Sequence, residues 1–374
     1  MIYLDSAATT LQKPPAVARA AASAMGRMAS PGRGGHRPAM LAAEVAFDCR
    51  QAAAELFQLD SPENVIFTLN ATHALNLAIK SVVKPGDTVV VSGYEHNAVT
   101  RPLHALGCQV KVARSPLFGR QAILEEFDRL VTAEVACVVC THVSNVFGFI
   151  LPIEEIAALC RRQGVPLIVD ASQSAGALKV HMDEWDCAFI AMPGHKGLYG
   201  PQGTGLLLCG QGRETGTLLE GGTGSLSAQQ DMPDFLPDRL EAGTHNVPGI
   251  AGLLEGIRYV KSRGEETILR HEQTLTRQAA EGLSRLPGVQ VFSAHEPESQ
   301  AGVLSFIIED MDCEEVGERL GQLGIAVRAG LHCAPYAHET VGTLASGTVR
   351  ASFSAFNTPS EVKRFVSVVS SLLQ

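Results

Sequence analysis

Between residues 84 and 170, short apolar segments typical of strands alternate with longer segments whose apolar spacing predicts helices. The strands are expected at 88–92, 110–113, 135–141 and 167–169. Strands that alternate with helices in this way form a parallel sheet with helices on both faces. Such sheets bind ligands at their carboxyl edge, where the strands end. The pattern therefore predicts an α/β protein with its site at that edge.

Three polar residues follow strands of this predicted sheet. His96, Asn145 and Asp170 all fall just beyond predicted strand ends, so all three are expected at the carboxyl edge. A carboxylate there points into the crevice in which open α/β sheets bind ligands. Helix capping remains an alternative for each of them, because such side chains commonly cap helices that follow strands.

One lysine, Lys196, lies in a loop rich in glycine and proline within residues 191–205. Gly194 and Gly197 on either side let the backbone and a ligand approach closely. A solvated surface lysine is the simpler interpretation of an isolated GHKG segment. Together with Asp170, however, Lys196 suggests pyridoxal phosphate. The aldehyde of this cofactor forms a Schiff base with a lysine, and its pyridinium nitrogen needs an anionic partner.

The sequence predicts a seat for the cofactor's phosphate upstream. The predicted strand 65–68 leads into a helical pattern that starts at Ala71 and carries Thr72 in its first turn. Free N–H groups and the helix dipole favour an anion at such a position. A helix cap is a compatible role for Thr72. His73 matches no ligand role and is expected at the surface or behind the site.

The nine cysteines are odd in number and irregularly spaced. Five lie in apolar patterns and are expected to be reduced core thiols, namely Cys49, Cys137, Cys160, Cys187 and Cys209. Cys137 and Cys140 form a CxxC, but on a strand residues three apart point to opposite faces, so we expect no metal site. Cys333 alone lies in a polar, turn-rich stretch.

The composition limits the partners. The formal charge of −9 without a basic run argues against nucleic acid or an anionic membrane surface. The N-terminus lacks the features of a signal peptide, and no apolar run approaches the roughly 18 residues of a transmembrane helix. These features favour a cytoplasmic protein.

The length of 374 residues suits a large domain and a smaller one. We place the large domain at 15–255 and the small one at 256–374 together with 1–14. The small α/β domain is expected to contain strands at 289–293, 303–308, 325–329 and 349–352, with helices at 313–323 and from 359.

Eight segments of the chain, in this order, resemble motifs of the class V aminotransferase fold and, within it, of the cysteine desulfurase and selenocysteine lyase family. They are YLDSAATT (3–10), YEHN (94–97), HVSNVFG (142–148), VDASQ (169–173), GHKGLYGPQGTG (194–205), EAGTHN (241–246), RAGLHC (328–333) and VRASFSAFNT (349–358). The resemblance covers nearly the whole chain, and RAGLHC is similar to the group II branch. Pro193, Gly197 and a slightly longer stretch from Cys333 to Arg350 depart from that branch and suggest a side subgroup.

The resemblance implies a fold type I pyridoxal phosphate enzyme and assigns its site. The cofactor would be held by Lys196, Asp170, Gln173, His96, Thr72, Ala71, His195, Asn145 and Thr244, and the substrate by Arg350, Asn145 and Ala8. In the family His96 stacks on the pyridine ring, and Gln173 meets the phenolic oxygen. Thr244 reaches the partner subunit's phosphate, which implies a homodimer. Arg33, His36 and Arg37 are expected either near substrate or the other subunit, or in a solvated basic loop.

The implied reaction removes sulfur from L-cysteine, or selenium from L-selenocysteine, and leaves L-alanine. Lys196, Cys333 and His96 are the expected catalytic residues, and a protein would accept the sulfur or selenium. Cys333 would attack as a thiolate, favoured by Arg328, Arg350 or a protonated histidine nearby. Two alternatives remain: an aminotransferase or epimerase that leaves Cys333 idle, and a silent scaffold, against which the complete Lys196, Asp170, His96 and Arg350 set argues.

Overall fold

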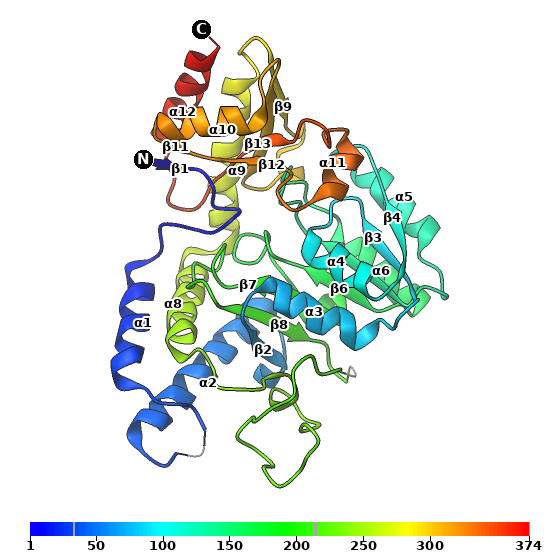
Figure 1. Ribbon diagram of the computed structural model, residues 1–374, viewed down its shortest axis with the longest axis vertical. Helices are drawn as coiled ribbons and strands as arrows, with labels where there is room; N and C mark the ends of the chain where they lie inside the picture. Colours follow the sequence, from blue (N-terminus) through cyan, green and yellow to red (C-terminus); the bar gives the residue numbers. More distant parts are fainter. Residues whose placement is uncertain (33, 213–214, 374) are drawn as a thin grey trace.

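The computed structural model describes residues 1–32, 34–212 and 215–373. A seven-stranded sheet in the order β2-β8-β7-β6-β5-β3-β4 forms the centre of the larger part (Figure 1). Its strands are β2 (Val65–Thr68), β3 (Thr88–Ser92), β4 (Gln109–Ala113), β5 (Cys137–Thr141), β6 (Leu167–Asp170), β7 (Phe189–Pro193) and β8 (Gly205–Cys209). The strands β3 to β7 run parallel to one another, as the alternation of patterns predicts.

The strand β8 was not predicted, and it is antiparallel to both of its neighbours. It follows the glycine-rich loop after β7 directly, without a helix between them. The loop that carries Lys196 therefore connects two adjacent antiparallel strands. All five residues of β8 are buried, which fits a continuous apolar run covered on both faces.

Helices cover both faces of the large sheet, as predicted. The helices α3 (Ala71–Val82) and α4 (Asn97–Ala105) share one core with residues of one sheet face, and α5 (Arg120–Leu130) and α6 (Ile153–Gln163) share another core with the opposite face. Cys137 belongs to the first core and Cys140 to the second, so the prediction that they point to opposite faces is confirmed. Both are buried free thiols, and Cys333 is exposed.

A second sheet, antiparallel and in the order β12-β13-β10-β9, lies at the other end of the molecule (Figure 1). It consists of β9 (Val289–Phe292), β10 (Val303–Ile308), β12 (Arg328–Gly330) and β13 (Thr348–Ser352), and it packs with α9 (Glu265–Leu283), α10 (Cys313–Gln322) and α12 (Pro359–Leu372). The side chain of Thr358 and that of Glu361 form a capping box that starts α12.

The expectation of one strand over 325–329 was wrong. The chain forms β11 (Ile325–Ala326), which pairs with β1 (Ile2–Tyr3) at the N-terminus, and then β12, which pairs with β13. The change of partner falls at Val327, between the two strands. A local apolar pattern carries no information about a partner strand more than 300 residues away. The pattern therefore predicts one continuous strand where the structure has two.

Three further helices, α1 (Pro15–Arg27), α2 (Arg37–Phe57) and α8 (Val247–Arg263), pack together beside the large sheet (Figure 1). Short helices missed by the sequence patterns are α7 (Met182–Trp185) and α11 (Pro335–Val341), with 3-10 turns η1 (Pro62–Asn64), η2 (Asp238–Leu240) and η3 (Pro297–Ser299). The division into residues 15–255 and 1–14 with 256–374 remains a prediction. Its second boundary would fall inside α8.

No helix within the described ranges is both long and apolar enough to cross a membrane. Among the same residues, no group of three or more His, Cys, Asp or Glu side chains is arranged to hold a metal ion.

Candidate active site

A cavity of about 210 Å³ opens at the carboxyl edge of the large sheet and is also lined by residues of the small sheet. It brings together every predicted site residue except Thr244, namely Ala8, Ala71, Thr72, His96, Asn145, Asp170, Gln173, His195, Lys196, Cys333 and Arg350. These residues come from segments spread over more than 340 positions of the sequence. Their convergence on one cavity is the geometric result that sequence patterns alone could not provide.

The loop of Lys196 is fixed by close backbone packing. A Cβ added at Gly197 would lie 2.3 Å from the carbonyl oxygen of Ala175, and one added at Gly176 would lie 2.2 Å from that of Gly197. Two chain segments therefore cross here at a distance that only glycine permits. The additional glycine at Gly197, which departs from the related branch, thus has a structural reason.

The surroundings of Lys196 lower the pKa of its amine. Burial lowers its pKa to about 8, Asp170 opposes this shift, and Arg350 adds to it. An amine with a pKa near 8 is partly neutral at physiological pH. It can then act as a nucleophile or accept a proton.

Asp170 ends β6 and is only 3% exposed. Its Oδ1 accepts a hydrogen bond from the backbone N–H of Ser172 at 2.9 Å. A buried carboxylate needs a positive partner, and Lys196 lines the same cavity. The pair offers an amine and an anion to a single ligand.

His96 acts both as a helix cap and as part of the cavity wall. Its Nδ1 accepts a hydrogen bond from the backbone N–H of Ala98 at 3.0 Å, which caps α4. Burial lowers the pKa of His96, although Asp170 opposes this shift. The ring is therefore neutral at physiological pH, and it presents a flat aromatic surface to the cavity.

The first turn of α3 provides an anion seat at the cavity. Asn70 caps the helix, because its Oδ1 accepts a hydrogen bond from His73 N–H at 2.9 Å. Among the described residues, the N–H groups of Ala71 and Thr72 donate no hydrogen bond within the chain. Both residues line the cavity, so their N–H groups are available to a phosphate.

Thr244 and His73, both considered in the sequence analysis, lie outside this cavity. Thr244 is exposed, and together with His73 it lines a separate hollow. His73 accepts a hydrogen bond there from Leu69 N–H at 3.3 Å. The buried carboxylate of Glu241 anchors this region, since it accepts hydrogen bonds from the Arg50 guanidinium and from Phe67 N–H. Whether Thr244 serves a second subunit remains a prediction.

The structure describes two of the three basic residues singled out near the N-terminus. Arg33 falls outside the described residues. His36 caps α2 through its Nδ1, which accepts from Ala39 N–H at 3.4 Å, and Arg37 is the first residue of that helix. Neither of these two lines the cavity of Lys196.

Cys333 lies in a tight turn with unusual backbone geometry. His332 and Cys333 have φ values of 51° and 56°, in the left-handed region that residues other than glycine seldom adopt. The backbone N–H of Ala334 donates to the carbonyl of Leu331 at 2.9 Å and closes the turn. The carbonyl of Cys333 also accepts a hydrogen bond from Asn97 N–H at 2.7 Å. These contacts hold an exposed thiol at the cavity rim.

His332 is not the positive neighbour that the sequence suggested for Cys333. Burial, together with Arg350, lowers the pKa of His332 to about 2, so the ring is neutral. Its Nε2 lies 3.1 Å from both the carbonyl and the hydroxyl oxygen of Thr348. Burial also lowers the pKa of His338 to about 4. Neither histidine carries a charge at neutral pH.

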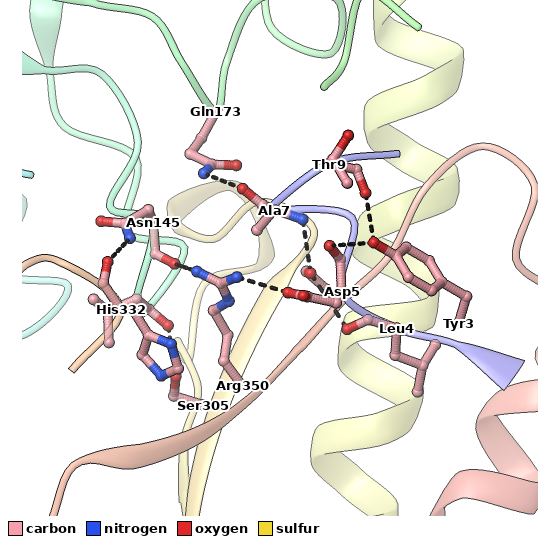
Figure 2. A network of polar contacts seen from close by, with 12 residues as sticks. Tyr3, Leu4, Asp5, Ala7, Thr9, Asn145, Gln173, Ser305, His332 and Arg350 are labelled. Carbon is pink, nitrogen blue, oxygen red and sulfur yellow. Dashed lines mark hydrogen bonds and ion pairs between the residues drawn. The ribbon is translucent and has the colours of Figure 1, made fainter. Parts of the chain in front are cut away.

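Arg350 is 2% exposed and is held by two contacts (Figure 2). One terminal nitrogen donates to the carbonyl of Asn145 at 2.9 Å, and the other lies 2.8 Å from Oδ1 of Asp5. Asn145 in turn donates from its side-chain amide to the carbonyl of His332 at 2.8 Å. The Nε of Arg350 is buried without a hydrogen-bond partner among the described residues. A buried charged donor in this state favours an anionic ligand.

Sequence reasoning gave Asp5 no role and named Arg328 only as a positive charge near Cys333. Arg328 lines the cavity and lies directly opposite Arg350 in the pairing of β12 with β13. Asp5 lies in the motif YLDSAATT, from which only Ala8 was selected. A like-charged pair on adjacent strands is unfavourable unless an anion lies nearby.

The family model described as "Aminotransferase class-V" matches residues 2–365. The chain belongs to this family. A probable cysteine desulfurase of Mycolicibacterium paratuberculosis is 32% identical over 381 residues, covering 99% of this chain and 55% of that relative, so the chain spans about half its length. Another, from Methanothermobacter thermautotrophicus, is 33% identical over 385 residues, with 97% of this chain and 92% of that one covered.

Solved structures of the family show the same fold. The apo structure of a cysteine desulfurase from Thermococcus onnurineus is 31% identical and superposes with a TM-score of 0.91, covering 99% of this chain and 94% of that one. The sequence-based expectation of a class V aminotransferase fold is therefore confirmed.

Proposed function

We propose that this protein is a pyridoxal phosphate-dependent cysteine desulfurase that converts L-cysteine to L-alanine and leaves the sulfur as a persulfide on Cys333. The observation that carries the proposal is the presence of Lys196, Asp170 and Cys333 around one cavity. A lysine with a depressed pKa beside a buried carboxylate suits the cofactor. An exposed thiol at the rim suits sulfur transfer and has no use in an aminotransferase.

The side chains of the cavity fit the cofactor group by group. Lys196 would carry it, Asp170 would face its pyridinium nitrogen, and His96 would lie against its ring. The N–H groups of Ala71 and Thr72 would hold its phosphate, with His195 and Gln173 nearby. Bound pyridoxal phosphate would supply an electron sink for the negative charge that develops at the substrate Cα.

The protein's own residues would perform the remaining steps. Arg350 would bind the substrate carboxylate beside Asn145 and Ala8, and Lys196 would take the Cα proton. The Cys333 thiolate would then attack the substrate sulfur. As the new S–S bond forms, the Cβ–S bond breaks, and the carbon keeps the electron pair and later takes a proton to become the methyl group of alanine.

The direct test is to mix the purified, cofactor-loaded protein with L-cysteine and to measure alanine and sulfide in the presence of a reducing thiol. Equal amounts of alanine and sulfide are expected. L-selenocysteine must be tested in parallel, because the same groups would accept it and a selenocysteine lyase remains the alternative. Keto acid formation without sulfide would overturn the proposal in favour of an aminotransferase.

We also propose that two copies assemble as a homodimer in the cytoplasm and pass sulfur to an acceptor protein. The support is that Thr244, expected to meet a phosphate, lies outside the cavity of its own chain. Sedimentation of the loaded protein should give a dimer, and Thr244→Val should weaken cofactor retention. A fully active monomer would contradict the proposal.

A further inference from the structure

The N-terminal segment of residues 3–10 crosses the candidate active site and is anchored on β13. The carbonyl of Leu4 accepts a hydrogen bond from Ser352 N–H at 2.7 Å, and Ala7 N–H donates to the hydroxyl of Ser352 at 2.8 Å. Ser352 lies two positions after Arg350 on the strand, so both side chains point to the same face. The anchor therefore brings Asp5 beside the Arg350 guanidinium (Figure 2).

The ion pair between Asp5 and Arg350 is well shielded. The exposed fraction is 2% for the arginine side chain and 19% for the aspartate side chain. Arg328, directly opposite on β12, adds a second positive charge at the cavity. With the carbonyl of Asn145 on one side and Asp5 on the other, the guanidinium has a fixed orientation. A guanidinium has five donors, so several remain for a ligand.

The same segment also contacts other residues of the site. The carbonyl of Ala7 accepts a hydrogen bond from the Gln173 side chain at 3.0 Å. Thr10 donates to the carbonyl of His195, next to Lys196, from its N–H at 3.1 Å and from its hydroxyl at 3.0 Å. One short stretch of chain thus sets the spacing between Arg350 and the Lys196 loop.

We propose that Asp5 is the positioning residue for Arg350 and sets the affinity of the site for the substrate carboxylate. It does so by fixing the guanidinium in the orientation that keeps its remaining donors open. The inference rests on the proposed function, because it takes Arg350 as the partner of that carboxylate. Asp5 touches neither substrate nor cofactor in this role, and its effect passes through Arg350.

The test compares two ligands of the cofactor-loaded enzyme that differ by a carboxylate. L-alanine and ethylamine are titrated while the visible absorbance of the bound cofactor is followed. Asp5→Ala removes the charge-assisted hydrogen bond between Asp5 and Arg350. We expect the Kd of L-alanine to rise about tenfold, which corresponds to the free energy of one such bond, and the Kd of ethylamine to stay within about twofold. The KM for L-cysteine should rise by a similar factor, with a smaller change in kcat.

Asp5→Asn provides the rescue. Its amide oxygen can accept the same hydrogen bond, so the Kd of L-alanine should stay within about twofold of the parent value. Asp48→Asn is the matched control, because Asp48 also pairs with an arginine, Arg258, at 3.4 Å, but on an exposed surface. This variant should bind both ligands like the parent.

Three results would overturn the inference: an unchanged Kd of L-alanine in Asp5→Ala, an equal weakening for ethylamine, or a kcat loss without a KM change. If Asp5→Ala does not fold, Asp5→Glu replaces it. The longer side chain keeps the charge but displaces the guanidinium, so unchanged L-alanine binding in that variant would equally refute the inference. If the parent enzyme binds ethylamine and not L-alanine, the assignment of Arg350 in the proposed function fails instead.

Discussion

The loop that carries Lys196 and the turn that carries Cys333 line the same cavity but differ in burial and in what fixes their position. Lys196 lies on a loop locked by glycine crossings, and burial changes the chemistry of its amine by lowering its pKa to about 8. Cys333 is exposed, and its position is fixed by a turn with two left-handed residues and by hydrogen bonds from other elements. Burial thus tunes a group that acts inside the site. Backbone geometry holds the Cys333 thiol at the rim, where the proposed function would have it pass on its sulfur.

The largest effect on turnover is expected from replacing the buried residue of this comparison, Lys196. Lys196→Ala should abolish turnover, by at least about a hundredfold, because the chain loses both the cofactor attachment and the proton acceptor. The visible absorbance of the bound cofactor should change at the same time. Lys111→Ala is the control, because Lys111 is exposed on β4 and does not line the cavity. An unchanged spectrum in Lys196→Ala would show that another lysine carries the cofactor.

Replacing the exposed residue, Cys333, should separate cofactor and substrate binding from sulfur transfer. Cys333→Ala should keep the cofactor and bind L-alanine like the parent, yet lose persulfide formation with L-cysteine by about a hundredfold or more. Turnover of L-selenocysteine should fall less, because selenium leaves more readily. Cys108→Ala, which changes a half-buried cysteine elsewhere, serves as the control. Desulfuration at the parental rate in Cys333→Ala would mean that Cys333 is not the nucleophile.

The pH profile should report the buried group and not the histidines near the thiol. In the proposed reaction Lys196 takes the Cα proton as a neutral free amine, so with the pKa of that amine at about 8 the active fraction should grow as the pH rises from 7 to 9. The single-turnover rate of Cα proton removal should increase about tenfold over that range. His332, whose pKa is lowered to about 2, should add no inflection. A rate that is flat from pH 7 to 9 would contradict the role of Lys196.

The comparison also explains what the sequence could and could not predict. Asp170 ends β6, and His96 and Lys196 lie a few residues beyond β3 and β7, so an apolar pattern followed by polar residues reveals them. The cysteine assignments follow from the same local patterns, and burial confirms the five core thiols. Local information of this kind reaches only a few residues along the chain.

The missed features depend on partners that are distant in sequence. Asp5 contacts Arg350 although the two residues are 345 positions apart in the sequence. The strand β11 is separate from β12 because β11 pairs with the N-terminal strand β1. Likewise, the pairing of Arg328 with Arg350 depends on the register of β12 and β13. The resemblance to a family identified the motif containing Asp5 but gave the residue no role. Only the assembled structure supplies one.

The smallest expected effect is a difference in stability between two variants of Cys333, which tests whether the backbone of this turn is strained. Cys333 has a φ of 56°, which costs a side-chain-bearing residue about 1 kcal/mol relative to glycine. Cys333→Gly should therefore be more stable than Cys333→Ala by about 0.5–1 kcal/mol, measured by denaturant unfolding of the two variants. At an ordinary exposed loop the order would be reversed, because glycine gains more freedom in the unfolded chain. The sign of the difference thus decides the matter: if the alanine variant is the more stable one, the thiol is held by its hydrogen-bonded neighbours alone, and the contrast with the Lys196 loop loses its basis in backbone geometry.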